Sequence, residues 1–269
     1  MFDDMNDHGI STQLSELCQK VGEFQLSHLT GVSQEAISDK GLNQLVSFVD
    51  VESEKMLVEG LKKIEPNAGF ITEEGTLKQG GEFPYYWIID PLDGTTNFLH
   101  GLPVFSISVA LMEADTLVAG IVHCPAMNEI FTAEKGQGAY LNGKQIKVSK
   151  TKNLKQSLIA TGFPYYQFQH TADYLELLGE LMRETQGLRR MGSAAIDLAY
   201  TACGRFDGFY ELGLSPWDVA AGALIVLEAG GEVSDFSGGM NYLFGGNIVA
   251  GNAEVKQALE ECISKHIQV

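Results

Sequence analysis

The stretch Trp87-Ile-Ile-Asp-Pro-Leu-Asp-Gly-Thr-Thr-Asn-Phe-Leu-His-Gly-Leu-Pro103 joins an apolar run to two carboxylates and a glycine-threonine turn. The apolar residues predict a strand, and Pro91 is expected to end it because proline cannot donate to a sheet. Gly94 and the threonines after it favour a turn whose backbone N–H groups face a bound anion. Asp90 and Asp93 would supply the oxygen ligands that Mg²⁺ prefers beside a substrate phosphate. The stretch therefore predicts a metal and phosphate site where a strand ends.

Two further acidic segments accompany this block. Glu73 and Glu74 lie in Phe70-Ile-Thr-Glu-Glu-Gly75, and Asp218 lies in Ser215-Pro-Trp-Asp-Val-Ala-Ala-Gly222. A lone Asp-Gly is usually a turn, and a lone pair of glutamates is usually a solvated loop. Several carboxylates around one point, however, repel each other unless cations neutralise them. The three segments together therefore favour a metal site over three separate surface features.

In this order, the three blocks resemble the inositol monophosphatase family, over most of the chain from about residue 50 to residue 231. The resemblance implies an α+β fold of layered α-β-α-β-α sheets and helices, of the inositol monophosphatase and fructose-1,6-bisphosphatase type. It also implies a single domain over residues 1–269 with two lobes, and a homodimer. Periodicity alone indicates only an α+β chain.

The resemblance assigns metal ligands to matching positions. Glu73, Asp90 and the backbone carbonyl of Leu92 would hold one Mg²⁺, and a second would be held by Asp90, Asp93 and Asp218. A third, weaker Mg²⁺ would bind near Glu73, largely through water. Mg²⁺ is thus the expected cofactor.

The same resemblance assigns catalytic and phosphate-binding roles. The N–H groups of Gly94 and Thr95 would receive a phosphate oxygen at a helix start. Glu73, Asp50 and Thr95 would form the catalytic group, in which the Thr95 hydroxyl, paired with Asp50, orients the attacking water. The implied reaction is direct in-line attack by a metal-activated water, without a phospho-enzyme.

The resemblance also implies substrate contacts for Asp93, for the turn Gly192-Ser193-Ala194 and for Glu211. A carboxylate and a small turn suit the hydroxyl groups of a polyol. Arg189 and Arg190 could form a second phosphate pocket, although a solvated or salt-bridged pair is the commoner arrangement. Outside these blocks, the spacing between Lys40 and Asp50 differs from the family's usual spacing between a mobile-loop lysine and this aspartate. The role of Lys40 is therefore open.

The resemblance implies a Mg²⁺-dependent, lithium-sensitive phosphatase acting on myo-inositol 1-phosphate and similar small polyol or sugar phosphates. Relatives with the same metal blocks hydrolyse fructose 1,6-bisphosphate, NADP, histidinol phosphate or 3'-phosphoadenosine 5'-phosphate, and pocket walls rather than metal ligands decide the substrate. The alternative from another class is a dimeric binding or regulatory protein on the same fold, for example a partner of a transcription or signalling complex.

Composition limits the partners. Lys and Arg number 18 against 35 Asp and Glu, for a net charge of -17, which argues against binding to nucleic acid. The first seven residues are acidic where a signal peptide would be basic, and no apolar run approaches the ~18 residues of a membrane span. The four cysteines are widely spaced, as expected for reduced thiols. We therefore expect a cytoplasmic protein with no membrane contact.

Hydrophobic periodicity gives a coarse order of elements. It predicts helices over roughly 14–29, 51–64, 174–183, 194–203 and 219–228. The helix over 219–228 is expected to be the last long one. An N-cap role is the alternative for Asp218, either in place of metal binding or together with it. Strands are expected at 87–89, 105–112, 117–123 and 129–133, as an antiparallel meander, and again at 158–161 and 208–211.

Overall fold

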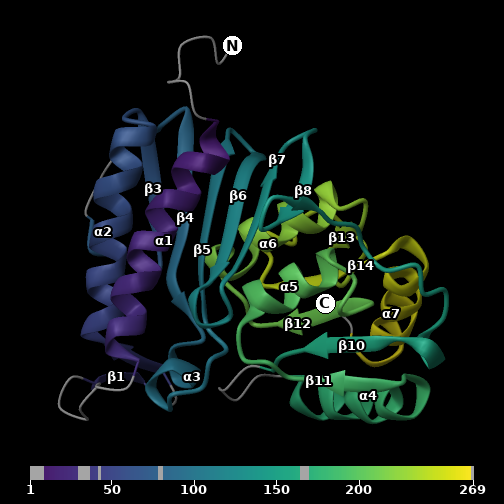
Figure 1. Cartoon of the computed structure of the whole chain (residues 1–269). Helices are drawn as coiled ribbons and strands as arrows, with labels where there is room; N and C mark the ends of the chain where they lie inside the picture. Colours follow the sequence, from purple (N-terminus) through teal and green to yellow (C-terminus); the bar gives the residue numbers. More distant parts are fainter. Residues whose placement is uncertain (1–8, 30–36, 42–43, 78–80, 164–169, 268–269) are drawn as a thin grey trace.

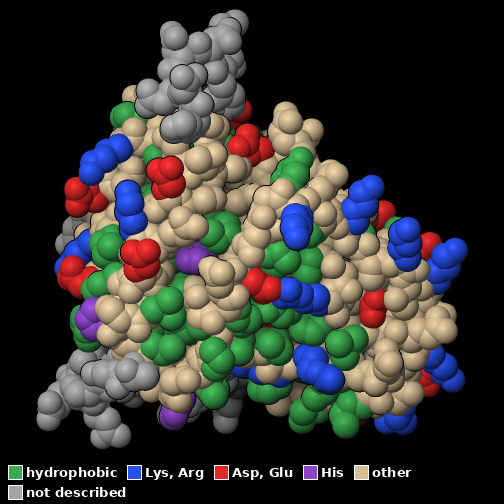
Figure 2. Space-filling model, viewed as in Figure 1, with side chains coloured by type: hydrophobic (Ala, Val, Ile, Leu, Met, Phe, Trp, Pro, Cys, Tyr) green, Lys and Arg blue, Asp and Glu red, His purple; other side chains and the backbone are tan. Residues whose placement is uncertain are grey.

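The structure is a computed structural model that describes residues 9–29, 37–41, 44–77, 81–163 and 170–267. For residues 37–41 and 44–47 it describes the backbone alone, so the Lys40 side chain lies outside the described residues. None of the helices in the described ranges is long and apolar enough to cross a membrane. On the face shown in Figure 2, basic side chains (blue) are scattered among acidic ones (red) rather than gathered in one patch.

A seven-stranded sheet forms the first half of the molecule (Figure 1). Its order is β3-β4-β5-β6-β7-β8-β9. The predicted antiparallel meander is confirmed from β4 to β7, whereas β3 was not predicted and lies parallel to β4. The strand bounds are β3 Ala68–Thr72, β4 Tyr85–Asp93, β5 Ser106–Glu113, β6 Thr116–Cys124, β7 Glu129–Glu134, β8 Gly138–Leu141 and β9 Lys144–Gln145.

A five-stranded sheet of order β11-β10-β12-β14-β13 forms the second half. Strand β10 is parallel to its neighbours β11 and β12, and the other neighbouring pairs are antiparallel. The strands predicted at 158–161 and 208–211 are confirmed as β10 and β12. The bounds are β10 Leu158–Thr161, β11 Gly187–Arg189, β12 Gly208–Leu212, β13 Glu232–Ser234 and β14 Asn247–Gly251.

Helices form three layers around the two sheets (Figure 1). Helices α1 (Ile10–His28) and α2 (Phe48–Ile64) pack on the outer face of the seven-stranded sheet. Helices α5 (Ala194–Ala202) and α6 (Pro216–Glu228) pack on each other between the sheets. Every residue of α6 from Val219 to Val226 is buried, as expected for a helix with sheets and helices around it. With α4 and α7 on the outer face of the second sheet, the layered α-β-α-β-α architecture is confirmed.

The expectation that residues 219–228 form the last long helix is wrong. Helix α4 spans Thr171–Glu184, as predicted within a few residues, but α7 (Ala253–His266) follows β14. The Asn252 side chain caps α7 by accepting from the Val255 N–H, and Val255, Leu259 and Ile263 are buried. These residues carry an N-cap signal and helical spacing that the sequence reasoning overlooked.

The expectation that Pro91 ends its strand is also wrong, because β4 continues to Asp93. Asp90 pairs with Ser108 of β5, and Asp93 pairs with Ser106, so β4 contains one extra residue between the two pairs. A bulge of this kind tolerates proline. Side chains three positions apart in a regular strand point to opposite faces. The extra residue therefore lets Asp90 and Asp93 turn toward the same point.

The remaining elements are short. Strands β1 (Ile37–Gly41) and β2 (Gln44–Ser47) form an antiparallel pair, and α3 (Thr95–Leu99) follows β4 directly. Two 3-10 helices span Pro125–Met127 and Leu154–Gln156.

Candidate metal and phosphate site

Three of the predicted ligands come together in space. Asp90, Asp93 and Asp218 each offer a carboxylate oxygen within 4.8 Å of the others. The first two come from the end of β4, and the third comes from α6 in the middle layer. The site thus lies where the C-terminal end of β4, an inner strand of the first sheet, meets the middle helix layer.

The alternative that Asp218 is an N-cap is wrong. Helix α6 begins at Pro216, and Ser215 is the N-cap residue. Asp218 lies in the first turn, where its Oδ2 accepts from the Ser215 N–H at 2.6 Å. This capping-box contact fixes the carboxylate in one orientation.

Asp93 is held by the start of helix α5. Its Oδ2 accepts from the Ser193 hydroxyl at 2.6 Å and from the Ala195 N–H at 2.8 Å. Ser193 is itself the α5 N-cap, because its Oγ also accepts from the Ile196 N–H at 3.3 Å. The predicted substrate turn therefore contacts a predicted metal ligand directly.

Burial makes the charged forms of these carboxylates unfavourable. The pKa of Asp90 is raised well above its usual value, first by desolvation and then by the charges of Glu73, Asp93 and Asp218. Desolvation raises the pKa of Asp218 to about 8, with a further contribution from Asp93. It also raises the pKa of Asp93 to about 6, although the Ser193 and Ala195 contacts oppose the shift.

A cation with hard oxygen preference fits this cluster. All three donors are carboxylates, without histidine or cysteine, which suits Mg²⁺ better than zinc. A bound divalent cation would neutralise the mutual repulsion that raises the pKa of Asp90. The residues present therefore fit the metal that the sequence predicts.

Glu73 lies beside this cluster, in the turn after β3. Its side chain is exposed, and its charge contributes to the raised pKa of Asp90. The turn is held by Glu54, a buried α2 residue that the sequence reasoning missed. Glu54 accepts from the N–H groups of Glu74 and Thr76, both at 2.8 Å, and from the Thr76 hydroxyl at 2.6 Å.

The predicted partnership of Thr95 and Asp50 is present as a contact. The Thr95 Oγ1 lies 3.0 Å from Asp50 Oδ1 and 3.0 Å from the carbonyl oxygen of Leu92. Asp50 is buried in the first turn of α2, so it has a fixed position against the start of α3. Leu92 is also buried, and it takes part through its backbone, because its N–H donates to Asp90 Oδ1 at 2.9 Å.

Gly94 allows the chain to turn from β4 into α3. Its φ is +94°, in the left-handed region, and it is the residue before the first turn of α3. An added Cβ would lie 2.9 Å from the Val104 carbonyl oxygen and 3.2 Å from that of Gly192. A side chain here would therefore be both strained and crowded.

On the predicted substrate side, Glu211 is half-buried on β12. Burial raises its pKa to about 8, while the positive charge of Arg190 lowers it and Asp93 raises it. Asp197, another residue that the sequence reasoning missed, is buried on α5, and its Oδ1 accepts no hydrogen bond from the described residues. A single carboxylate within an apolar helix was the available signal for it.

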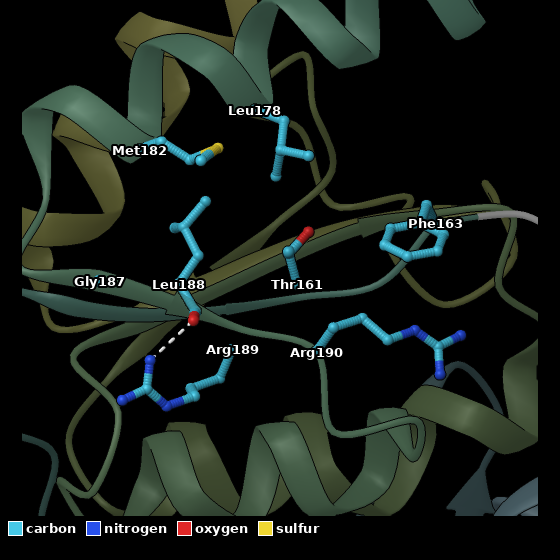
Figure 3. A pocket seen from close by; sticks show the side chains of 8 residues that line it. All are labelled: Thr161, Phe163, Leu178, Met182, Gly187, Leu188, Arg189 and Arg190. Carbon is cyan, nitrogen blue, oxygen red and sulfur yellow. Dashed lines mark hydrogen bonds between the residues drawn. The ribbon is translucent and has the colours of Figure 1, made fainter.

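The two neighbouring arginines differ in environment. Arg189 is exposed and donates to the carbonyl of Leu188 at 2.8 Å. Arg190 is half-buried, with its guanidinium 5.1 Å from the centroid of the Phe163 ring. Both line a cavity of about 370 Å³ (Figure 3), in which Arg190 points along Phe163 and Arg189 turns away. Apolar side chains contribute much of the lining, namely Phe163, Leu178, Met182 and Leu188.

The raised pKa values predict that Mg²⁺ stabilises the chain more as the pH rises. The pKa of an aspartate in the unfolded chain is about 4. An aspartate whose pKa is higher than this in the folded chain makes its full contribution to stability below about pH 4. That contribution is lost as the pH rises through the pKa of the folded chain. The pKa values of Asp93 and Asp218 are about 6 and about 8, so this loss of stability continues as the pH rises through these values. Mg²⁺ bound to the ionised carboxylates should offset that loss.

We therefore expect the increase in Tm caused by Mg²⁺, relative to a chelator, to grow between about pH 5 and about pH 8. Asp218→Asn should reduce this growth. Asp115→Asn, at an exposed position in the turn after β5, should leave it unchanged. Thermal unfolding followed by circular dichroism measures the effect, and a pH-independent increase in Tm would contradict the prediction.

Comparisons with known proteins agree with this geometry. The pattern of the Inositol monophosphatase family matches residues 7–268. Over 222 residues the chain is 47% identical to Nus factor SuhB of Escherichia coli strain K12, covering 82% of this chain and 83% of that protein. It is 44% identical over 229 residues to Inositol-1-monophosphatase of Mesorhizobium japonicum, covering 85% and 86%.

A solved structure extends the match to three dimensions. The extragenic suppressor protein suhB from Bartonella henselae superposes with a TM-score of 0.89 at 40% sequence identity, covering 96% of this chain and 99% of that chain. The predicted resemblance and the predicted layered fold are thus both confirmed. This chain belongs to the inositol monophosphatase family.

Proposed function

We propose that the chain is a Mg²⁺-dependent phosphatase that hydrolyses a small polyol or sugar phosphate, with myo-inositol 1-phosphate as the preferred substrate. The observation that supports this most is the gathering of Asp90, Asp93 and Asp218 within 4.8 Å, beside the contact between Thr95 and Asp50. Relatives at 44% identity bear the name Inositol-1-monophosphatase.

The ligand set is proposed as the sequence implies it. Glu73, Asp90 and the carbonyl oxygen of Leu92 would hold one Mg²⁺, and Asp90, Asp93 and Asp218 would hold a second. When bound, Mg²⁺ neutralises the phosphate and lowers the pKa of water. The three aspartates position this charge, because the orientations of their carboxylates are fixed by β4, α5 and α6.

The chain itself supplies groups that orient water and phosphate. The Thr95 hydroxyl has a single proton, so when it donates to Asp50 its lone pairs can accept from an attacking water. The first N–H groups of a helix lack acceptors within the helix, so those of Gly94 and Thr95 can donate to a phosphate oxygen.

Hydroxyl groups of the leaving alcohol are proposed to contact Glu211, Asp93 and the turn at 192–194. The side chains of Ser193 and Ala194 are buried and the Ser193 hydroxyl donates to Asp93, so this turn would contact the substrate through its backbone at the half-buried Gly192. Glu211, held near the positive charge of Arg190, can accept from the hydroxyls of a polyol.

Phosphate release tests this proposal directly. The substrates are inositol 1-phosphate, fructose 1,6-bisphosphate, NADP, histidinol phosphate and 3'-phosphoadenosine 5'-phosphate, each with Mg²⁺ and with a chelator. We expect release to be fastest from inositol 1-phosphate, to vanish with the chelator and to return with Mg²⁺. A different best substrate would keep the chemistry and change the specificity. Release that persists in the chelator would contradict the proposed use of metal.

A second candidate is a binding role like that of the relatives named Nus factor SuhB, which are 47% identical to this chain. Such a role depends on surface rather than on the carboxylate cluster. Binding to a component of a transcription complex that survives both Asp93→Asn and a chelator would support it. Binding lost with the metal would tie it to the proposed phosphatase site.

A further inference from the structure

The carboxylate of Glu211 occupies the space in which residue 162 would carry a side chain. Thr161, at the end of β10, pairs in parallel register with Tyr210 of β12, so Gly162 lies beside Glu211. A Cβ added to Gly162 would lie 1.9 Å from Oε1, 2.0 Å from Cδ and 2.2 Å from Oε2 of Glu211. Carbon atoms that are not bonded do not approach so closely, and any side chain at 162 must therefore displace this carboxylate.

Lack of space for a side chain, rather than backbone conformation, is the reason for glycine at position 162. The φ of Gly162 lies outside the left-handed region, so its backbone conformation suits any residue. The backbone is also anchored, because the Tyr174 hydroxyl of α4 donates to the Gly162 carbonyl and lies 2.8 Å from the Thr161 hydroxyl oxygen. A substitution would consequently move the flexible Glu211 side chain rather than the strand.

The next residue, Phe163, contacts Arg190, whose positive charge acts on Glu211. The Phe163 ring lies against the Arg190 guanidinium, as Figure 3 shows, and a Cβ on Gly192 would lie 2.7 Å from Arg190 Nη1. Arg190 is thus confined between Phe163 and the substrate turn. Its charge lowers the pKa of Glu211 against the effect of burial. Residues 161–163 therefore set both the space and the charge around this carboxylate.

We propose that Gly162 is a specificity-determining residue that acts through Glu211, by leaving room for a carboxylate that accepts from hydroxyl groups of the leaving alcohol. The inference rests on the proposed phosphatase function. The substrate class it selects is a phosphate monoester whose alcohol carries further free hydroxyls. Gly162 acts through the Glu211 carboxylate that occupies the space of its missing side chain, so it is a positioning residue for substrate preference.

Gly162→Ala tests the proposal with two substrates. Above about pH 8, where Glu211 is ionised, loss of a hydrogen bond to its charge lowers affinity by about 10- to 100-fold. We therefore expect kcat/KM for inositol 1-phosphate to fall by about that factor, mainly through KM, and kcat/KM for p-nitrophenyl phosphate to change less than about twofold. The second substrate lacks free hydroxyls on its leaving group, and it reports on the metal and phosphate machinery alone.

Two further variants separate this role from a structural one. In a Glu211→Ala background no carboxylate remains to be displaced, so adding Gly162→Ala should cause no additional loss. Gly179→Ala is the matched control, because its Cβ would meet only Arg183 Nη1, at 3.7 Å, and both substrates should be hydrolysed as by the parent chain.

The outcomes are distinct. Equal losses with both substrates, or an additional loss in the Glu211→Ala background, would overturn the role of Gly162 and leave the proposed function standing. A parent chain that releases phosphate from neither substrate would overturn the proposed function and this inference with it.

Discussion

Asp93→Asn is expected to lower Mg²⁺-dependent phosphate release by about three orders of magnitude or more, because a metal ligand that supports several kcal/mol of charge stabilisation is lost. The asparagine oxygen can still accept from the Ser193 hydroxyl and the Ala195 N–H, as Asp93 Oδ2 does. The amide nitrogen then replaces the second carboxylate oxygen and directs its N–H groups toward the cation. The start of α5 should thus stay in place while cation affinity is lost.

Initial rates measured over a range of Mg²⁺ concentrations check this expectation. Asp115→Asn makes the same chemical change at an exposed turn and should leave the rates unchanged. Thermal unfolding in a chelator should show both variants folded, and removal of a raised-pKa carboxyl at position 93 should not lower the Tm. A rate within about tenfold of the parent at saturating Mg²⁺ would mean that Asp93 is not a metal ligand.

The metal cluster could be predicted from sequence because its ligands lie in short segments with strong local signals. Asp90 and Asp93 come after a short apolar run in the last part of β4, and Asp218 lies in the first turn of a helix. The bulge that turns the two β4 carboxylates toward one point could not be predicted, because it arises from pairing with β5. The sequence therefore identified Asp90 and Asp93 as ligand candidates, whereas the orientation of their side chains toward one point depends on tertiary structure.

The second sheet was harder to predict than the first. Its edge strands β11 and β13 are three residues each, too short for a clear alternation of polar and apolar side chains. The order β11-β10-β12-β14-β13 pairs strands that are distant in the chain, and local patterns carry no information about such pairing. By contrast, Glu54 lies one helical turn after Asp50, a spacing that places both carboxyls on one face of α2 and was available from sequence.

Thr95→Val is expected to lower kcat by about 10²- to 10⁴-fold, the usual contribution of a group that assists proton removal. Valine keeps the branching of threonine at Cβ, so the backbone at the start of α3 should keep its course. The Thr95 hydroxyl oxygen, which this change removes, lies 3.0 Å from Asp50 Oδ1 and 3.0 Å from the Leu92 carbonyl oxygen. Thr95→Ser restores the hydroxyl and should recover most of the lost rate.

Thr96→Val provides the matched control, because this neighbouring threonine is exposed on the same helix. The kcat values and the pH dependence of kcat, measured at saturating Mg²⁺, separate two roles for the contact between Thr95 and Asp50. If Thr95→Val lowers kcat and shifts its pH dependence while Thr96→Val does neither, the hydroxyl acts on the attacking water. If both variants retain kcat within about threefold, the contact only anchors α3 against α2, and activation of water must then depend on the carboxylate cluster alone.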